Sequence, residues 1–342
     1  MNSAFLTLLL REIEADLVGL RVATIAAPEP DVIVVTFARA ERALVLDAGI
    51  DAPRVGWEAM RVPPRATRFA ATAVARLAGA SVMRIAQPFG DRWAQFEFDN
   101  GLRLVWENFG RRANIMLLDG GVIAACVREY PPAADITRAI RIGDVYPPPP
   151  DGPLRDDVAR PSADGFASFA EAGKAWGAAT RSRAERLRIL VVLRAHWRER
   201  DRAARRALTA VDRDLAWASR YGEYRRSAEA LVASFRMIER GASEARVPDP
   251  ADAETMLVIP LDPAKSAREN SDRYFRDAKR AERGHAALEV RRAMLAANAE
   301  RAAAELARWD GAAGDAFLDG DDADGAKHAA LRAAAIAAGL VE

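Results

Sequence analysis

The sequence predicts an α+β protein in which a mostly antiparallel β domain precedes a long antiparallel coiled-coil arm with a small α/β tip. Two observations support this prediction. Short segments with strand-like alternation, separated by Gly-rich turns, fill much of the first 150 residues. Apolar residues then recur at spacings of three and four within residues 181–310, which is the period of a coiled coil.

The composition limits the chemistry that the chain can perform. Its 50 Lys and Arg nearly balance its 49 Asp and Glu, so the net charge identifies no partner. The single cysteine, Cys126, excludes internal disulfides and multi-cysteine zinc sites, and three histidines argue against a histidine-built metal centre. We therefore expect no cofactor. The apolar run at 4–10 is short and precedes charged residues, so we expect a packed helix, no signal peptide, no membrane span and a cytoplasmic location.

The β domain is predicted to occupy residues 1–150. Its strands are expected at 21–27, 32–38, 43–48, 92–98, 102–108, 114–118 and 122–128, with a helix at 67–77. An Asp-Asn-Gly turn and an Asp-Gly-Gly turn separate the last four strands into two pairs. Because Asn-Gly tolerates the positive φ of a tight hairpin, these four strands should form an antiparallel meander. The proline run at 147–150 is expected to close the domain.

The arm is predicted at 181–310, after a loop-like linker at 151–180 that is rich in Pro, Gly, Ala and Ser. Its two helices should meet along apolar seams, Leu190, Leu193, Trp197, Ala204, Leu208, Val211 and Leu215 on one helix and Ala278, Ala281, His285, Leu288, Leu295, Ala299, Ala302, Leu306 and Trp309 on the other. Alanines on these seams should let the backbones approach closely. The insert at about 219–265 should form the tip, since two helices joined through it must run antiparallel.

Charge is distributed unevenly along the arm. Residues 181–215 hold eleven Arg and five acidic residues, and residues 310–324 hold six Asp and no basic residue. We expect Arg194, Arg198, Arg205 and Arg206 to offer a positive surface to a polyanion such as RNA. Some arginines of this run should also pair with Glu282, Glu289 or Glu300 of the opposite helix. The alternative is a solvated helix face and a solubilising tail.

Several segments resemble the NFACT family of ribosome quality-control factors, also called fibronectin-binding protein A-like. The family's Ile-x-Leu-Asp-Pro, Glu-Asn and aromatic-rich helix start correspond to Ile259, Leu261, Asp262, Pro263, Glu269, Asn270, Tyr274 and Phe275. Residues 9–25, 87–98, 106–121 and 221–242 resemble further family segments and follow in the family's order. The resemblance therefore extends over most of the chain.

The resemblance implies an NFACT-N domain, similar in fold to the N-terminal domain of formamidopyrimidine glycosylases, and an arm with a middle domain at its tip. It also implies that the protein binds tRNA and the large ribosomal subunit that carries peptidyl-tRNA, without a membrane or a small-molecule substrate. Bacterial relatives promote alanine tailing of stalled peptides. The chain lacks the NFACT-R motifs and has at most residues 151–180 for the helix-hairpin-helix module, so tailing is doubtful; 311–342 would be an acidic tail or the start of a linker.

The family's Asp-Arg pair, implied in tRNA binding, corresponds to Asp91 and Arg92. A guanidinium can bind a phosphate or a base edge with two hydrogen bonds, and a neighbouring carboxylate can orient it. A surface ion pair at a strand start is the alternative. Arg111 and Arg112 on the next turn suit phosphate contacts, and Asn114 either joins them or holds the turn through its own hydrogen bonds. A capping box of Ser266 and Glu269 is expected to begin the second long helix.

No catalytic motif is present, so the expected function is positioning rather than catalysis. The leading hypothesis is a ribosome-associated factor in the rescue of stalled ribosomes. A coiled-coil scaffold or adhesin-type interaction protein is the second. A DNA-glycosylase-like lyase is the third, but such enzymes need Pro-Glu after the initiator Met, and here Asn2 and Ser3 follow Met1.

Overall fold

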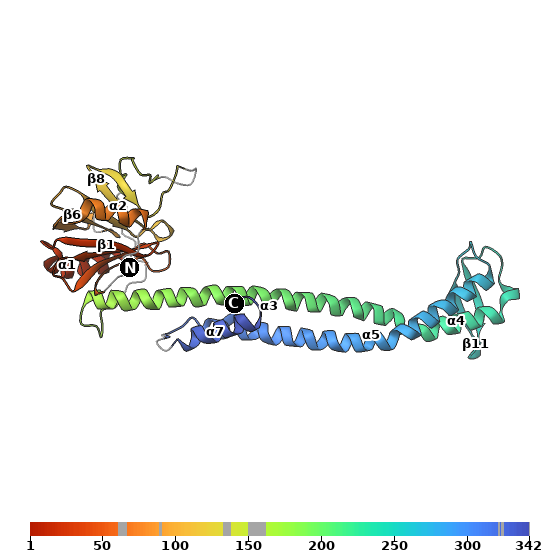
Figure 1. Ribbon diagram of the computed structural model, residues 1–342. Coiled ribbons are helices and arrows are strands. Elements are labelled where there is room, and N and C mark those ends of the chain that lie inside the picture. The colour runs from red at the N-terminus through yellow and green to blue at the C-terminus, as the bar shows by residue number, and fades with distance from the viewer. Residues whose placement is uncertain are drawn as a thin grey trace. The chain divides into compact units, whose positions relative to one another are not determined.

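A computed structural model describes residues 1–60, 67–88, 91–132, 138–149, 162–320, 322 and 325–341 (Figure 1). It divides into two compact units. The N-terminal unit comprises Met1–Leu187 with Gly320–His328, and the arm unit comprises Arg188–Asp319 with Ala329–Glu342. The end of the proline run and most of the predicted linker before residue 162 lie outside the described residues.

Two antiparallel sheets build most of the N-terminal unit. One has the order β1 (Val22–Glu29), β2 (Val32–Phe37), β3 (Arg42–Asp47) and β4 (Arg54–Ala59), and the other has the order β5 (Val82–Ala86), β6 (Trp93–Phe98), β7 (Arg103–Glu107), β8 (Asn114–Asp119) and β9 (Val122–Cys126). The predicted four-stranded meander is confirmed as β6–β9, and Gly101 in its first turn has a φ of 81°. The sequence did not predict β4 and β5.

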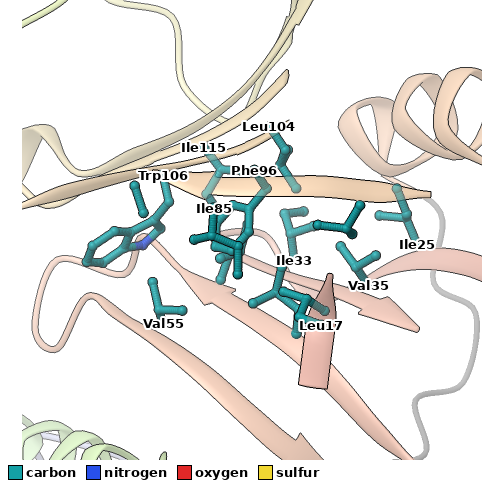
Figure 2. Packing of buried hydrophobic residues seen from close by; sticks show 14 of the residues in the cluster. Leu17, Ile25, Ile33, Val35, Val55, Ile85, Phe96, Leu104, Trp106 and Ile115 are labelled. Atoms are coloured by element: carbon teal, nitrogen blue, oxygen red, sulfur yellow. The ribbon is translucent and has the colours of Figure 1, made fainter. Parts of the chain in front are cut away.

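A large apolar core lies between the sheets. Figure 2 shows Ile33 and Val35 of β2 pointing toward Phe96 and Ile115 of the second sheet. Helix α1 (Ser3–Leu17) contributes its apolar face to the same core. Helix α2 (Arg68–Leu77), which corresponds to the helix predicted at 67–77, also contributes its apolar face. The indole N–H of Trp106, a fully buried residue, donates to the carbonyl of Asp47 at 2.8 Å and so links the sheets. The first residues of the chain therefore belong to the core of this unit.

Helix α3 (Phe169–Ala218) begins well before residue 181, so residues 169–180 are not a loop-like linker as predicted. The linker was predicted from the many small residues of this segment, although one of them, alanine, is the best helix former. The Glu12 carboxylate accepts the backbone N–H groups of Phe169 at 2.6 Å and Ala170 at 3.2 Å. An acceptor at this position satisfies donors that the helix cannot satisfy itself. The Ser168 hydroxyl accepts the Glu171 N–H at 3.1 Å, so a local cap and a residue on α1 together satisfy the first turn of α3.

The first turns of α3 pack against β4 through a buried ion pair. Arg54 pairs with Glu58, and both side chains are almost completely buried. A Cβ added at Gly177 of α3 would lie 2.6 Å from the Cδ of Arg54. Lys174, one turn earlier, lies 3.5 Å from the other Glu58 oxygen. Glycine at 177 is therefore required because the helix backbone passes directly over the Arg54 side chain.

In the arm unit, α3 and α5 (Ala267–Trp309) run antiparallel beside each other (Figure 1). Arg194 contacts Trp309, Asp212 contacts Arg292, and Ser219 contacts His285. As the residue number rises along α3, the number of the contacting residue on α5 falls, as in an antiparallel pair. The residues of both predicted seams are buried or half-buried, and Leu190, Leu193 and Trp309 share one apolar cluster. The predicted antiparallel pair of helices is therefore confirmed.

The tip of the arm unit consists of α4 (Tyr221–Ala233), the short 3₁₀ helix η3 (Phe235–Met237) and the hairpin of β10 (Glu244–Asp249) and β11 (Asp252–Pro260). The predicted capping box is confirmed: Ser266 and Glu269 cap α5 reciprocally. Buried Asn270 donates to the carbonyls of Asp262, Lys265 and Ser266 and accepts from the N–H of Asp262. The Glu-Asn motif therefore shapes the entry to α5.

The acidic segment after α5 is folded, in contrast to the predicted tail or linker. It forms α6 (Gly311–Asp315) and α7 (Ala326–Ala337), whose Leu331 and Ala335 pack on Leu190 and Leu193 of α3. In the N-terminal unit, buried Arg186 pairs with Asp322 at 2.9 Å. Although burial opposes it, backbone N–H groups of Lys327 and His328 together with Arg186 lower the pKa of Asp322. Alanine-rich sequence and long-range ion pairs explain why this segment folds.

Candidate nucleic-acid interface

Asp91 and Arg92 lie immediately before β6, in a recess that leaves 22 % and 18 % of their side chains exposed. The Asp91 carboxylate accepts the backbone N–H of Arg92 at 2.6 Å, while it stays 3.9 Å from the guanidinium Nε. The pair is therefore loose, and the carboxylate orients the backbone more than the guanidinium. This geometry differs from a tight surface ion pair.

The guanidinium of Arg92 rests on an aromatic ring. Its Cζ lies 5.8 Å from the centre of the Phe109 ring, and its buried Nε has no hydrogen-bond partner among the described residues. Burial together with the charge of Arg92 lowers the pKa of the Met1 α-amino group to about 5. Because the Nε is buried, only the terminal N–H groups of this partly exposed guanidinium could bind an anionic ligand.

Gln87 supports this recess, and sequence reasoning did not identify it. Its side-chain amide donates to the carbonyls of Asp91 at 2.6 Å and Ser3 at 3.1 Å, and it accepts from the Thr7 hydroxyl at 2.6 Å. These bonds connect the start of α1 to the strand entry at Arg92. The bonds to Thr7 and Ser3 join residues 80 and 84 positions apart, so no local pattern could have revealed them.

Arg111 and Arg112 are brought near this recess, because their 3₁₀ helix η2 (Gly110–Arg112) directly follows Phe109. Both side chains are exposed. Asn114 is different: it is fully buried, donates to the carbonyl of Arg128 at 2.8 Å and accepts the Arg128 N–H at 3.0 Å. Its contacts support the alternative role, in which it holds the turn.

The four arm arginines fall into two pairs. Arg194 contacts Asp315 at 2.7 Å and the Trp309 carbonyl at 2.6 Å, and Arg198 contacts Asp310 at 2.7 Å. Arg205 and Arg206 instead pair with Asp201 and Glu199 of their own helix, and 67 % and 68 % of their side chains are exposed. The prediction that these arginines pair with Glu282, Glu289 or Glu300 is wrong. The segment after α5 supplies carboxylates to Arg194 and Arg198, and α3 itself supplies them to Arg205 and Arg206. Arg205 and Arg206 are thus the more available pair.

The described part of the chain offers little support for a reactive cysteine, a metal site or a membrane span. Burial, followed by the charge of Glu129, raises the pKa of the Cys126 thiol to about 11, so that it stays protonated at neutral pH. No group of three or more His, Cys, Asp or Glu could hold a metal ion within the ranges that the structure covers. None of the helices described is sufficiently long and apolar to cross a membrane.

Solved structures with similar folds come from three bacteria. They are the N-terminal domain of fibronectin-binding protein PavA from Streptococcus pneumoniae (22% identity, TM-score 0.41, 46% of this chain and 65% of that one), the N-terminal part of the fibronectin/fibrinogen-binding protein of Streptococcus suis (25%, 0.41, 44% and 62%) and the fibrinogen binding protein of Staphylococcus aureus (20%, 0.38, 44% and 56%). The matches thus span less than two thirds of each of these chains.

No curated protein sequence matches the chain. A family model does: the model of the NFACT N-terminal and middle domains matches residues 2–172 and 178–311. These ranges contain both sheets, the recess at Arg92, the paired helices and the tip. The match covers most of the 342 residues, so the protein belongs to the NFACT family.

Proposed function

We propose that the protein binds tRNA and the large ribosomal subunit that carries peptidyl-tRNA, and that it acts in the rescue of stalled ribosomes. Membership of the NFACT family supports this proposal. The observation that carries the proposal is Arg92, whose partly exposed guanidinium lies on the Phe109 ring and is only loosely paired with Asp91. Phosphate oxygens are the acceptors that such a group binds best.

The two units supply different contacts in this proposal. Arg92, Arg111 and Arg112 of the N-terminal unit would bind tRNA, and the exposed Arg205 and Arg206 would contact ribosomal RNA. The protein would act by positioning, without a bond-making residue and without a cofactor. Alanine tailing is not part of the proposal.

Co-sedimentation with large subunits that carry peptidyl-tRNA tests the ribosome contact. The wild-type chain should migrate with these subunits, and reversing the charge of Arg205 and Arg206 to Glu should abolish co-migration. The matched control reverses Arg213, an exposed arginine of the same helix. If the folded wild-type chain stays at the top of the gradient, the proposal is wrong and a scaffold role is preferable.

A further inference from the structure

A hollow of about 500 Å³ lies between α3 and α5 in the middle of the arm. It is lined by Trp197, Arg200, Ala203, Ala204, Asn298, Arg301 and Ala302 and is open to solvent on one side. Ala302 on its floor is 4 % exposed, whereas Arg200 and Arg301 at the rim are exposed. Its volume falls within the range of small-molecule sites, roughly 300–1,000 Å³.

The hollow corrects the expectation that seam alanines draw the two backbones together. The large side chain of Trp309 is fully buried in one apolar cluster with Leu190 and Leu193. Beside Ala204 and Ala302, in contrast, the seam leaves a hollow. Coiled coils ordinarily place Leu or Ile there, because an unfilled seam costs stability.

Arginines from both helices stand at the rim. Within the described ranges Arg200 and Arg301 make no ion pair, in contrast to the four arm arginines with carboxylate partners. Arg301 instead donates to the side-chain oxygen of Asn298 and to the Ala297 carbonyl.

Two carboxylates on the same stretch are engaged elsewhere. Asp201 binds Arg205 through both oxygens at 2.9 Å, and Glu305 accepts the Trp309 indole N–H at 3.1 Å. These two carboxylates therefore do not pair with the rim arginines, and the exposed Glu300 beside Arg301 makes no ion pair with either of them in the part of the chain that the structure describes.

An aromatic surface completes the site. Trp197 is half-buried in its wall, and the Arg200 guanidinium lies 5.9 Å from the centre of its ring. Rings of this kind stack on nucleobases without regard to sequence, and guanidiniums bind the adjoining phosphate. Guanidinium groups that can bind a phosphate and an aromatic ring that can stack on a base thus line the same hollow.

We propose that this hollow binds one nucleotide of single-stranded RNA, with its base against Trp197 and its phosphate between Arg200 and Arg301. The proposal rests on the proposed function and adds to it a specific, unpaired nucleotide contact on the arm. It differs from the contact of Arg205 and Arg206, which needs only an RNA backbone.

Fluorescence anisotropy of the full chain with a short labelled single-stranded RNA tests this site. Arg200→Ala and Arg301→Ala should each weaken binding about tenfold or more, whereas Arg213→Ala, a matched arginine on α3, should change it less than about twofold. A duplex of the same length should bind the wild type more weakly than the single strand. Equal losses for Arg200→Ala and Arg213→Ala, or no preference over the duplex, would overturn the proposal.

A variant that fills the hollow distinguishes binding inside it from attraction to the charge of the arginines. Ala302→Leu keeps both arginines and should raise the melting temperature, because it fills the seam, while it abolishes the single-strand preference. A stabilised Ala302→Leu protein with unchanged RNA affinity would overturn the proposal. If the Ala302→Leu variant still co-sediments with large subunits, ribosome binding does not need the hollow. If RNA binding depends on Arg200 but the wild type does not bind large subunits, the RNA site in the hollow is supported and the proposed function is wrong.

Discussion

Gly177→Ala tests the packing of α3 against β4. Alanine is favoured over glycine inside a helix by about 1 kcal/mol, so the substitution should stabilise if nothing lay opposite. The new Cβ would lie 2.6 Å from the Arg54 Cδ and 3.0 Å from its Nε. Arg54 cannot swing into solvent without leaving its buried pair with Glu58.

Breaking a buried pair costs roughly 3–5 kcal/mol, so the net loss should be about 2–4 kcal/mol after the helix propensity is subtracted. Thermal unfolding followed by tryptophan fluorescence should show a melting temperature lowered by roughly 5–15 °C. Gly284→Ala on α5 is the matched control, since a Cβ there meets nothing within 4 Å. It should raise stability. A Gly177→Ala protein stabilised to the same degree would refute the described position of Arg54.

Three further outcomes follow from the contacts of single residues. Glu12→Ala removes the acceptor of two N–H groups at the start of α3 and should cost about 0.5–2 kcal/mol in urea unfolding; an unchanged midpoint would contradict the cap. Because the pKa of Asp322 is lowered in the folded chain, its contribution is present above the unfolded pKa and lost as pH falls through the folded one, so Asp322→Asn should destabilise at pH 7 but not near pH 2. Since the pKa of the Cys126 thiol is about 11, iodoacetamide should alkylate it at pH 8 about a hundredfold more slowly in the folded than in the unfolded chain, and equal rates would contradict its burial.

Local sequence signals predicted the parts of the fold that local chemistry determines. The turn at Gly101, the coiled-coil period and the capping box at Ser266 each involve residues a few positions apart. The strand β4 was missed because it carries Arg54 and Glu58, which read as exposed residues. They are buried only because they pair with each other.

Features that depend on distant residues escaped prediction for a different reason. Glu12 adds to the local Ser168 cap of α3 from 157 positions away, and Gln87 is tied to Ser3 across 84 positions. In the candidate site, the sequence identified Arg92 through a motif, but its support by Phe109 depends on the fold of the next hairpin. Asn114 looked equally available, yet its buried contacts with Arg128 are visible only in the folded chain.

Titration of labelled tRNA against salt concentration tests the central claim most directly. The wild-type chain should bind with an affinity that falls linearly with log salt, as counterion release requires. Arg92→Ala should weaken binding about tenfold and reduce the slope by about one, while Arg42→Ala, an exposed arginine of the first sheet, should change neither. Equal affinities and slopes for wild type and Arg92→Ala would contradict the assignment of the Arg92 recess as an RNA-binding site.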